Sequence, residues 1–397
     1  MNTLHRKEYL ETIKKYKDLD LIKVLTGVRR CGKSTILLQF IDFLKQDGIE
    51  ENQIIYYNFE KILDDKLYDY KFLYHTILER KVPGKKLYVL LDEIQEVKNF
   101  EKAIDSLYLD KEIDIYITGS NANLLSSELA TLLTGRHIEI RIYPFSFKEY
   151  TEAKNENIDE AFNHYLIFGG MPYTLELNDP ETKIEYLNSL YSTVLLKDIV
   201  KRKNIKDVGL LEDLSSFLCD SVGSIISAKS IADTLTSKGR KVSSITIDNY
   251  ISFLSESLLF YKCKRYDIKG KQNLESLNKL YIVDQGFRLF LTNSHNNYGN
   301  ILENIVYIEL LRRGYKVKIG KVNNLEVDFI CKKNNDLKYI QVSASVLDKN
   351  TFNRELKPLS QINDNFEKTI ITMDELPIAK DGIKVLNIKD FLLYSNK

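Results

Sequence analysis

The stretch LIKVLTGVRRCGKST, residues 21–35, decides the fold of this chain. Its first six residues form a short apolar run that ends at Gly27, a pattern typical of a buried strand entering a turn. Residues 27–34 match G-x-x-x-x-G-K-[ST], a glycine-rich loop that cradles phosphate groups between a strand and a helix. A helical pattern begins at Lys33, so the motif has the flanks it requires. The alternative is a chance Gly-Lys-Ser turn.

The loop predicts a site for the triphosphate tail of a nucleotide. Its glycines let consecutive backbone N–H groups face a phosphate, and the helix N-terminus adds positive potential at the same place. We expect Lys33 to reach the β- and γ-phosphates and the Ser34 hydroxyl to ligate Mg²⁺. Arg29 and Arg30 either contact phosphate or pair with acids. Cys31 is either an oxidisable thiol or only a small residue that fits.

A second motif, LYVLLDE at residues 87–93, is an apolar strand that ends in two acids. Asp92 would hold Mg²⁺ through its water shell, and Glu93 would polarise the attacking water as a general base. Two neighbouring carboxylates repel each other unless a cation offsets their charge. The alternative is a strand that is capped by a solvated Asp-Glu turn.

Two weaker signals follow further along the chain. The strand ITG at residues 117–119 ends in Ser120 and Asn121, which could sense the γ-phosphate or orient the water, although such turns are common. Arg136 stands just before a strand and could act as an arginine finger, in cis or toward a neighbouring subunit. The alternative for Arg136 is a surface arginine without such a role.

Strands and helices alternate from residue 21 to residue 142, which predicts an α/β domain with a parallel sheet and helices on both faces. We place this domain at 1–150 and a helical lid or linker at 151–208. Three helices and an extended segment then predict a winged-helix domain at 209–278. A further α/β unit is expected at 279–397.

The 397 residues include 57 Lys and Arg against 56 Asp and Glu, so no global field directs the chain to nucleic acid or membrane. No apolar run is long enough to span a bilayer, and residues 1–20 are charged and lack a signal-like core. We therefore expect a cytoplasmic protein. The four cysteines lie far apart, without a CxxC pair or a nearby His, so the sequence indicates neither a disulfide framework nor a zinc site.

Residues 227–272 nevertheless hold nine Lys and Arg against four Asp and Glu, a local net charge of +5. The presumed recognition helix, residues 244–259, contains Asp248 and Glu256 and no Lys or Arg, so base-specific reading is poorly supported. Non-specific DNA contact and a protein-binding or purely structural wing remain as alternatives. The basic residues that flank this helix are Lys238, Arg240, Lys241, Lys262, Lys264 and Arg265.

The runs LTGVRRCGKST, VLLDEIQEV, ITGSNANLLSSELATLLTGRHIEIRIYPFSFKEY and YLIFGGMPY together resemble the bacterial and archaeal AAA-type P-loop ATPases of uncharacterised function that carry a restriction-nuclease-like C-terminal domain. The resemblance covers nearly the whole chain. It implies that Asp92 and Glu93 serve Mg²⁺ and water and that Ser120 or Asn121 is the sensor. It also implies ATP binding by Gly27, Val28, Arg29, Arg30, Cys31, Gly32, Lys33, Ser34 and Thr35.

The last unit has the outline of a PD-(D/E)xK nuclease core, with Glu303 on a helix and Asp328 on a strand. Such cores use Glu-x-Lys on the next strand to hold Mg²⁺ and activate water, but here this strand carries Gln341-Val342-Ser343. We therefore expect a nuclease-derived domain without cutting activity, unless a residue from elsewhere restores it.

The sequence thus predicts an ATPase that uses Mg²⁺ and binds ATP and ADP, and whose nucleotide state changes its domain arrangement. Its predicted partners are DNA or a protein client, with homo-oligomerisation as a further option and no membrane association. The alternatives are an ATP-binding regulatory protein with negligible turnover and an ATP-regulated nuclease.

Overall fold

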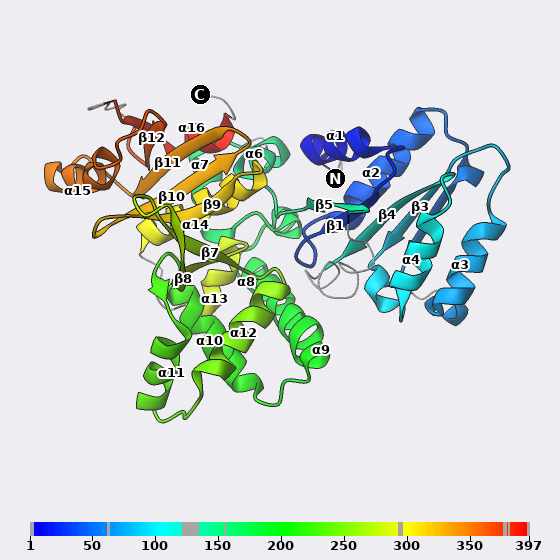
Figure 1. The fold of residues 1–397 in the computed structure, drawn as a ribbon, viewed down its shortest axis with the longest axis horizontal. Coiled ribbons are helices and arrows are strands. Elements are labelled where there is room, and N and C mark those ends of the chain that lie inside the picture. Colours follow the sequence, from blue (N-terminus) through cyan, green and yellow to red (C-terminus); the bar gives the residue numbers. More distant parts are fainter. Residues whose placement is uncertain are drawn as a thin grey trace. The chain divides into compact units, whose positions relative to one another are not determined.

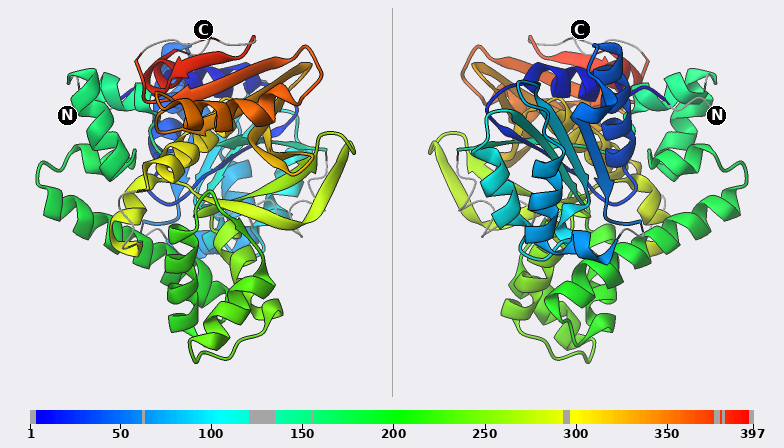
Figure 2. Two further views of the ribbon diagram at one scale, coloured as in Figure 1. Left: turned by 90° about the vertical axis from the view of Figure 1, so that its left-hand side faces the viewer. Right: turned by 90° about the vertical axis from the view of Figure 1, so that its right-hand side faces the viewer.

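The computed structural model describes residues 4–61, 64–120, 135–154, 156–292, 297–375, 379 and 382–394. The chain divides into two compact units, Met1–Pro144 with Glu256–Leu258 and Phe145–Ser255 with Leu259–Lys397 (Figures 1 and 2). Within the described residues, no helix is both long and apolar enough to cross a membrane.

The first unit contains a five-stranded parallel sheet with the order β2-β3-β4-β1-β5. The central strands are buried along their whole length, as the apolar runs of the sequence predict for a sheet that is covered on both faces. The strands are β1 (Ile22–Thr26), β2 (Ile54–Asn58), β3 (Leu87–Asp92), β4 (Ile113–Gly119) and β5 (His137–Arg141).

Helices cover both faces of this sheet, as Figure 1 shows. On one face, α3 (Tyr70–Glu79) and α4 (Phe100–Tyr108) bury their apolar residues against the alternate side chains Val24, Val89 and Ile115. On the other face lie α1 (Lys7–Tyr16) and α2 (Lys33–Gln46); the rings of Phe40 and Tyr116 are 4.7 Å apart there. The predicted α/β fold with a parallel sheet is therefore confirmed. Residues 124–133, where the alternation of strands and helices in the sequence predicts a further helix, lie outside the described residues.

The strand register brings the predicted motifs to one edge of the sheet. Thr26, the last residue of β1, is paired with Gly119 at the end of β4, and Asn58 is paired with Asp92. Because all five strands are parallel, the loops after β1, β3 and β4 leave the sheet at the same carboxyl edge. In α/β sheets this edge is where ligands bind.

The second unit begins with helices and continues into an eight-stranded sheet. Its first helices are α6 (Phe147–Lys154), α7 (Ile158–Phe168), α8 (Pro180–Thr193), a π-helix (Val194–Val200) and α9 (Lys201–Lys203). They are followed by α10 (Val208–Asp220), α11 (Ala228–Ser237) and α12 (Ser244–Glu256). The later helices are α13 (Arg288–Leu291), α14 (Tyr298–Arg312), α15 (Lys349–Ser360) and α16 (Ile388–Leu393).

The eight-stranded sheet has the order β13-β12-β11-β10-β9-β7-β8-β6. Its strands are β6 (Ile225–Ile226), β7 (Phe260–Asp267), β8 (Gln272–Ile282), β9 (Lys316–Val322), β10 (Leu325–Lys333), β11 (Asp336–Ser343), β12 (Glu367–Thr372) and β13 (Lys384–Asn387). Residue 278, where the sequence analysis places a domain boundary, lies inside β8. Strand β7 of the β7–β8 hairpin (Figure 2) pairs with β9 in parallel, so one sheet joins the two predicted domains.

The first glycine of the motif YLIFGGMPY, Gly169, is required by a close approach of Asp284 inside the second unit. The N–H of Gly170 donates to Asp284 Oδ2 at 2.7 Å, and the N–H of Gly286 donates to Oδ1 at 2.9 Å. Gly169 has a φ of +70°, and a Cβ there would lie 1.8 Å from Asp284 Oδ1. Burial raises the pKa of Asp284 to about 6, although the two N–H groups oppose the rise.

We expect Gly169→Ala to destabilise the protein by at least ~2 kcal/mol, because it combines a disfavoured backbone conformation with a steric clash. Urea denaturation monitored by circular dichroism measures the change. Gly239→Ala is the matched control: Gly239 has a φ of +90° and open space around its missing Cβ, so only the backbone cost of about 1 kcal/mol applies. Equal losses in the two variants would contradict the close approach of Asp284.

Candidate nucleotide-binding site

The loop between β1 and α2 requires glycine at both motif positions, for two different reasons. A Cβ on Gly27 would lie 2.3 Å from the carbonyl oxygen of Ile142 and 2.7 Å from the sulfur of Cys31. Gly32 immediately precedes α2 and has a φ of +103°, a conformation that favours glycine. The loop therefore exposes backbone rather than side chain where it meets the N-terminus of α2, as a phosphate cradle requires.

Lys33, the first residue of α2, is buried and turns back onto the loop. Its Nζ donates to the carbonyl oxygens of Gly27 at 3.0 Å and Val28 at 3.4 Å. The same Nζ lies 3.1 Å from Glu93 Oε1, which makes a buried ion pair. Burial by itself lowers the pKa of the ammonium, but the charge of Glu93 outweighs this effect and raises the pKa of Lys33. Lys33 is therefore protonated at neutral pH.

The backbone holds Glu93 in place directly after β3. Its φ of 55° and ψ of 46° are left-handed, and its N–H donates to Thr118 Oγ1 at 2.9 Å. Burial favours the neutral acid, but Lys33 and the amide of Gln95 stabilise the carboxylate and lower the pKa of Glu93 to about 2. Glu93 is therefore ionised at neutral pH, although it is almost fully buried.

Asp92, the last residue of β3, accepts hydrogen bonds on both carboxylate oxygens. The donors are Thr118 Oγ1 on Oδ1, and Asn58 Nδ2 and the Tyr56 hydroxyl on Oδ2. The Ser34 hydroxyl also hydrogen-bonds to this carboxylate. Burial raises the pKa of Asp92 in spite of these donors, and the charge of Glu93 adds to the rise. A bound cation would offset the free-energy cost of a buried, charged Asp92 and would stabilise its ionised form.

Ser120 follows the end of β4 beside the loop. It is fully buried, and its Oγ has no hydrogen-bond partner within the part of the chain that the structure describes. A buried hydroxyl without a partner is costly unless a ligand or water completes it. Asn121, the second predicted sensor, lies outside the described residues.

The remaining loop residues differ in their surroundings. Arg29 is buried and pairs with Glu60, whereas Arg30 is exposed and has a φ of 63°. Cys31 is fully buried, and burial raises the pKa of its thiol. The interpretation of Cys31 as a small residue that fits the loop is thus the better supported one, because a buried thiol with a raised pKa is unreactive. Ser34 and Thr35 are partly buried.

Arg6 is a buried residue of this region that the sequence analysis missed. One of its guanidinium nitrogens, NH1, donates to the carbonyl oxygens of Cys31 and Tyr143, both at 2.9 Å. Its guanidinium also lies over the ring of Tyr9, 4.5 Å from the centroid. Arg6 therefore holds the loop backbone in place through its hydrogen bond to the carbonyl oxygen of Cys31. Nothing in the pattern around residue 6 signals this role, because its partners are as many as 137 residues away.

Arg136 does not belong to the phosphate site of its own chain. Its carbonyl oxygen accepts from the N–H of Ile22, which places it at the amino edge of the sheet, opposite the loop. Its side chain pairs with Asp105 at 2.7 Å and lies over the ring of Tyr108. The five residues of β1 separate the two edges by about 16 Å. A finger acting in cis is excluded by this arrangement, and action toward a neighbouring subunit stays a prediction.

The second unit brings the predicted nuclease-type acids together around a lysine from another strand. Lys279 Nζ lies 2.8 Å from Glu303 Oε1, 2.7 Å from Glu326 Oε1 and 3.8 Å from Asp328 Oδ1. Gln341 accepts from the N–H of Asp328. The ammonium thus lies where a cation between the carboxylates would be. Among the described residues, no group of three or more His, Cys, Asp and Glu could hold a metal ion.

Two family models match parts of this chain. Residues 20–151 match the family model described as an AAA domain, and residues 159–298 match a domain of unknown function (DUF8612). In solved structures, the Walker-type ATPase of Pyrococcus abyssi has a TM-score of 0.49 and 16% identity, over 73% of this chain and 96% of that chain. The Aeropyrum pernix ORC1 protein, solved in complex with DNA, has a TM-score of 0.33 and 12% identity, over 72% and 91%.

Two relatives match along most of their length. An uncharacterised protein of Haemophilus influenzae is 41% identical over 404 residues, covering 98% of each chain. The uncharacterised protein MJ1544 of Methanocaldococcus jannaschii is 31% identical over 388 residues, covering 93% of this chain and 85% of the relative. This chain therefore belongs to the family of AAA-domain proteins that includes these bacterial and archaeal relatives.

Proposed function

We propose that this protein binds ATP with Mg²⁺ at the carboxyl edge of the five-stranded sheet and hydrolyses it. The observation that carries the proposal is the buried Lys33–Glu93 pair, which joins the loop lysine to the acid after β3. Beside it lies the Ser120 hydroxyl, which has no partner among the described residues. AAA-family membership supports nucleotide binding in general. The loop, the lysine and the acids supply the particular groups that phosphoryl transfer needs.

The residues present fit both ligands. The loop between β1 and α2 and the N-terminus of α2 would hold the phosphates, with Lys33 as the cation that contacts them. Mg²⁺ prefers oxygen ligands: the Ser34 hydroxyl would supply one, and the Asp92 carboxylate, to which Ser34 is hydrogen-bonded, would hold the ion through its water shell. When bound, Mg²⁺ would neutralise charge on the β- and γ-phosphates.

Lys33 controls whether Glu93 can act as a base. The Lys33 ammonium has three protons, and two loop carbonyls and Glu93 now accept them. A triphosphate that enters the loop competes for the same ammonium. Drawing Lys33 toward phosphate removes the charge that keeps the pKa of Glu93 near 2, so Glu93 becomes a better proton acceptor when substrate is present. Ser120 Oγ would then donate to the phosphate or the attacking water.

The accessory regions follow as part of the same proposal. We assign α10, α11 and α12 with the β7–β8 hairpin as a winged helix, and the unit after residue 279 as a nuclease-derived fold without cutting activity. The helix order and the hairpin support the first assignment. Lys279 among the three carboxylates supports the second, because an internal ammonium there competes with any metal ion.

We expect Lys33→Ala to weaken Mg-ATP binding at least 100-fold, because it removes the only buried ammonium next to the loop among the described residues. Isothermal titration calorimetry at millimolar Mg²⁺ measures the change. Lys45→Ala is the matched control, since Lys45 lies on the same helix, is exposed and pairs with Glu51. If both variants lost Mg-ATP binding to the same extent, the assignment of Lys33 to the nucleotide site would be wrong.

An absence of binding heat for every nucleoside triphosphate with the unaltered chain would overturn the proposed function as a whole. Binding without release of phosphate would favour the alternative, a regulatory protein that holds ATP as a ligand.

A further inference from the structure

A hollow of about 870 Å³ lies over the sheet of the second unit, on a face that is shared by β7, β9, β10 and β11. The turn between β7 and β8 borders it on one side, and the loop between α15 and β12 borders it on the other. Five lysines and one aspartate line it, a net charge of +4 in a chain whose total is +1. These residues are Lys269, Lys271, Lys316, Lys318, Lys332 and Asp364.

The lysines of this hollow lie close to one another, and most of them have no carboxylate partner among the described residues. Lys332 on β10 is directly opposite Lys316 on β9 in the antiparallel register, and like charges in such a pair destabilise a sheet. Lys318 donates to Asn273 Oδ1 at 2.7 Å and lies over the ring of Tyr266. Within the described residues, the other four lysines make no ion pair with a carboxylate. Among the described residues, these four lysines are therefore without a carboxylate partner, and the residues that line the hollow keep a net charge of +4.

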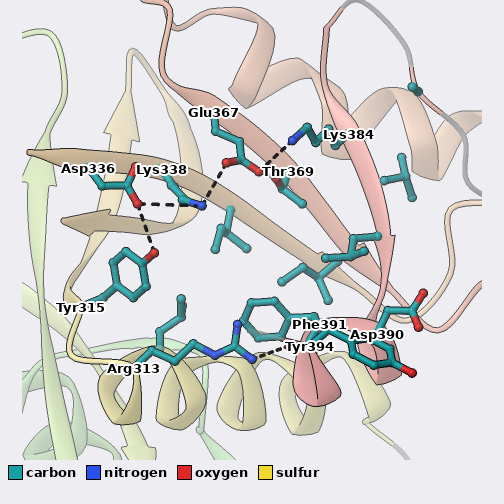
Figure 3. A pocket seen from close by; sticks show the side chains of 16 residues that line it. Arg313, Tyr315, Asp336, Lys338, Glu367, Thr369, Lys384, Asp390, Phe391 and Tyr394 are labelled. Atoms are coloured by element: carbon teal, nitrogen blue, oxygen red, sulfur yellow. Dashed lines mark hydrogen bonds and ion pairs between the residues drawn. The ribbon is translucent and has the colours of Figure 1, made fainter. Parts of the chain in front are cut away.

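The opposite face of the same sheet shows that this is not a general feature of the unit. Lys338 alternates with Leu337 and Tyr339 along β11, so it points to the other face, into a pocket of about 600 Å³ (Figure 3). There Lys338 pairs with Glu367 at 3.0 Å, and Lys384 pairs with the same carboxylate at 3.4 Å. The lysines of this pocket are paired with a carboxylate, whereas four of the five lysines of the hollow have no such pair among the described residues.

The shape of the hollow selects among anions. Its floor consists of side chains of paired strands, so it offers no run of free backbone N–H groups to cradle one phosphate. Lysines repeat along β9 at a spacing of about 6.8 Å and continue onto β10, which suits a chain of phosphates. Phe366, at the border, is 45% exposed, and its ring face suits an unstacked base. In a duplex the faces of the bases are already covered.

We propose that this hollow binds single-stranded nucleic acid, with Lys316, Lys318 and Lys332 on the phosphates and Phe366 stacked on a base. The site is distinct from the basic residues that flank the predicted recognition helix. One of those, Arg240, is already paired with Asp207 and Asp213. The proposal does not depend on ATP binding, because its residues lie in the second unit and its test needs no nucleotide.

The test is a salt titration of the affinity for a fluorescein-labelled 20-nucleotide thymidine oligomer, followed by fluorescence anisotropy on the full chain. Each phosphate contact contributes a slope of about −0.7 to the logarithm of affinity against the logarithm of salt. Lys316→Gln with Lys332→Gln should reduce the steepness by about 1.4 and weaken binding about 10-fold or more at 100 mM salt. Phe366→Ala should weaken binding about 5-fold or more without changing the slope.

Lys349→Gln with Lys357→Gln is the matched control, since both lysines are exposed on α15, do not line the hollow and change the net charge equally. The variant with Lys316→Gln and Lys332→Gln should unfold at no lower a temperature than the unaltered chain, because the substitutions relieve the repulsion between the two lysines. The proposal would be overturned if the two double variants bound the oligomer equally weakly. It would also be overturned if the unaltered chain did not bind the oligomer at low salt. Tighter binding of a 20-base-pair duplex, or equal binding of polyglutamate, would also overturn it.

Discussion

Glu93→Gln is expected to reduce the rate of ATP hydrolysis by about 10²- to 10⁴-fold, the range in which loss of a general base is measured. Glutamine keeps the size of the side chain and its contact with Lys33 Nζ, but it cannot accept a proton from water. Phosphate release under saturating Mg-ATP measures the effect. This expectation rests on the proposed function, in which Glu93 acts once substrate has drawn Lys33 away.

The same variant should bind Mg-ATP at least as tightly as the unaltered chain. In the free protein Glu93 holds the Lys33 ammonium at 3.1 Å, and a triphosphate has to compete with that charge. A neutral glutamine competes less strongly, so binding and turnover should change in opposite directions. A structural defect would weaken both.

Glu112→Gln is the control for this prediction. Glu112 is exposed, pairs with Lys81 and immediately precedes β4, at the amino edge of the sheet, so its replacement should change neither quantity. A Glu93→Gln variant that hydrolyses ATP at half the normal rate would remove Glu93 from the mechanism and leave the site as a binding site alone.

Lys279→Met is expected to destabilise the second unit by about 3–5 kcal/mol at pH 7.5. The variant leaves Glu303, Glu326 and Asp328 close together without the ammonium that lies 2.7–3.8 Å from their oxygens. Methionine fills the volume of the lysine stem, so the loss reports on charge rather than on a cavity. Urea denaturation of the full chain, followed by circular dichroism, measures the loss.

Acidification should restore part of this loss. Burial already raises the pKa of Asp328 and of Glu303 in the intact cluster, although Lys279 opposes the rise. Without Lys279 both pKa values rise further, so the folded state binds more protons than the unfolded state. Stability then increases as the pH falls. The deficit of the variant should therefore be smaller at pH 5.5 than at pH 7.5.

Lys384→Met provides the comparison with an exposed pair. Lys384 is 65% exposed and lies 3.4 Å from Glu367, so solvent screens its contribution to less than about 1 kcal/mol. A loss in Lys279→Met that is equally small, or that does not depend on pH, would mean that the three carboxylates are not held together by this ammonium.

Much of the first unit could be predicted because its signals are local. The apolar runs of β1, β3 and β4, the glycines at 27 and 32 and the acids that end β3 each occupy a few consecutive residues. Their strand period and turn chemistry do not depend on distant parts of the chain. Parallel strands joined by helices then require the motifs to meet at one edge. The positions of Lys33, Asp92 and Ser120 follow from that rule.

The sequence by itself therefore determined a phosphate loop on a parallel α/β sheet, since hydrophobic period and glycine placement are properties of neighbouring residues. Only the tertiary structure decided that Arg6 supports the loop, that Lys279 pairs with acids of the second unit, and that β7 joins β9 in one sheet. These outcomes depend on which buried charges and strand edges find partners far along the chain. A composition or a periodicity carries no information about such pairings, because the energy of a buried charge is set by the atoms folded around it.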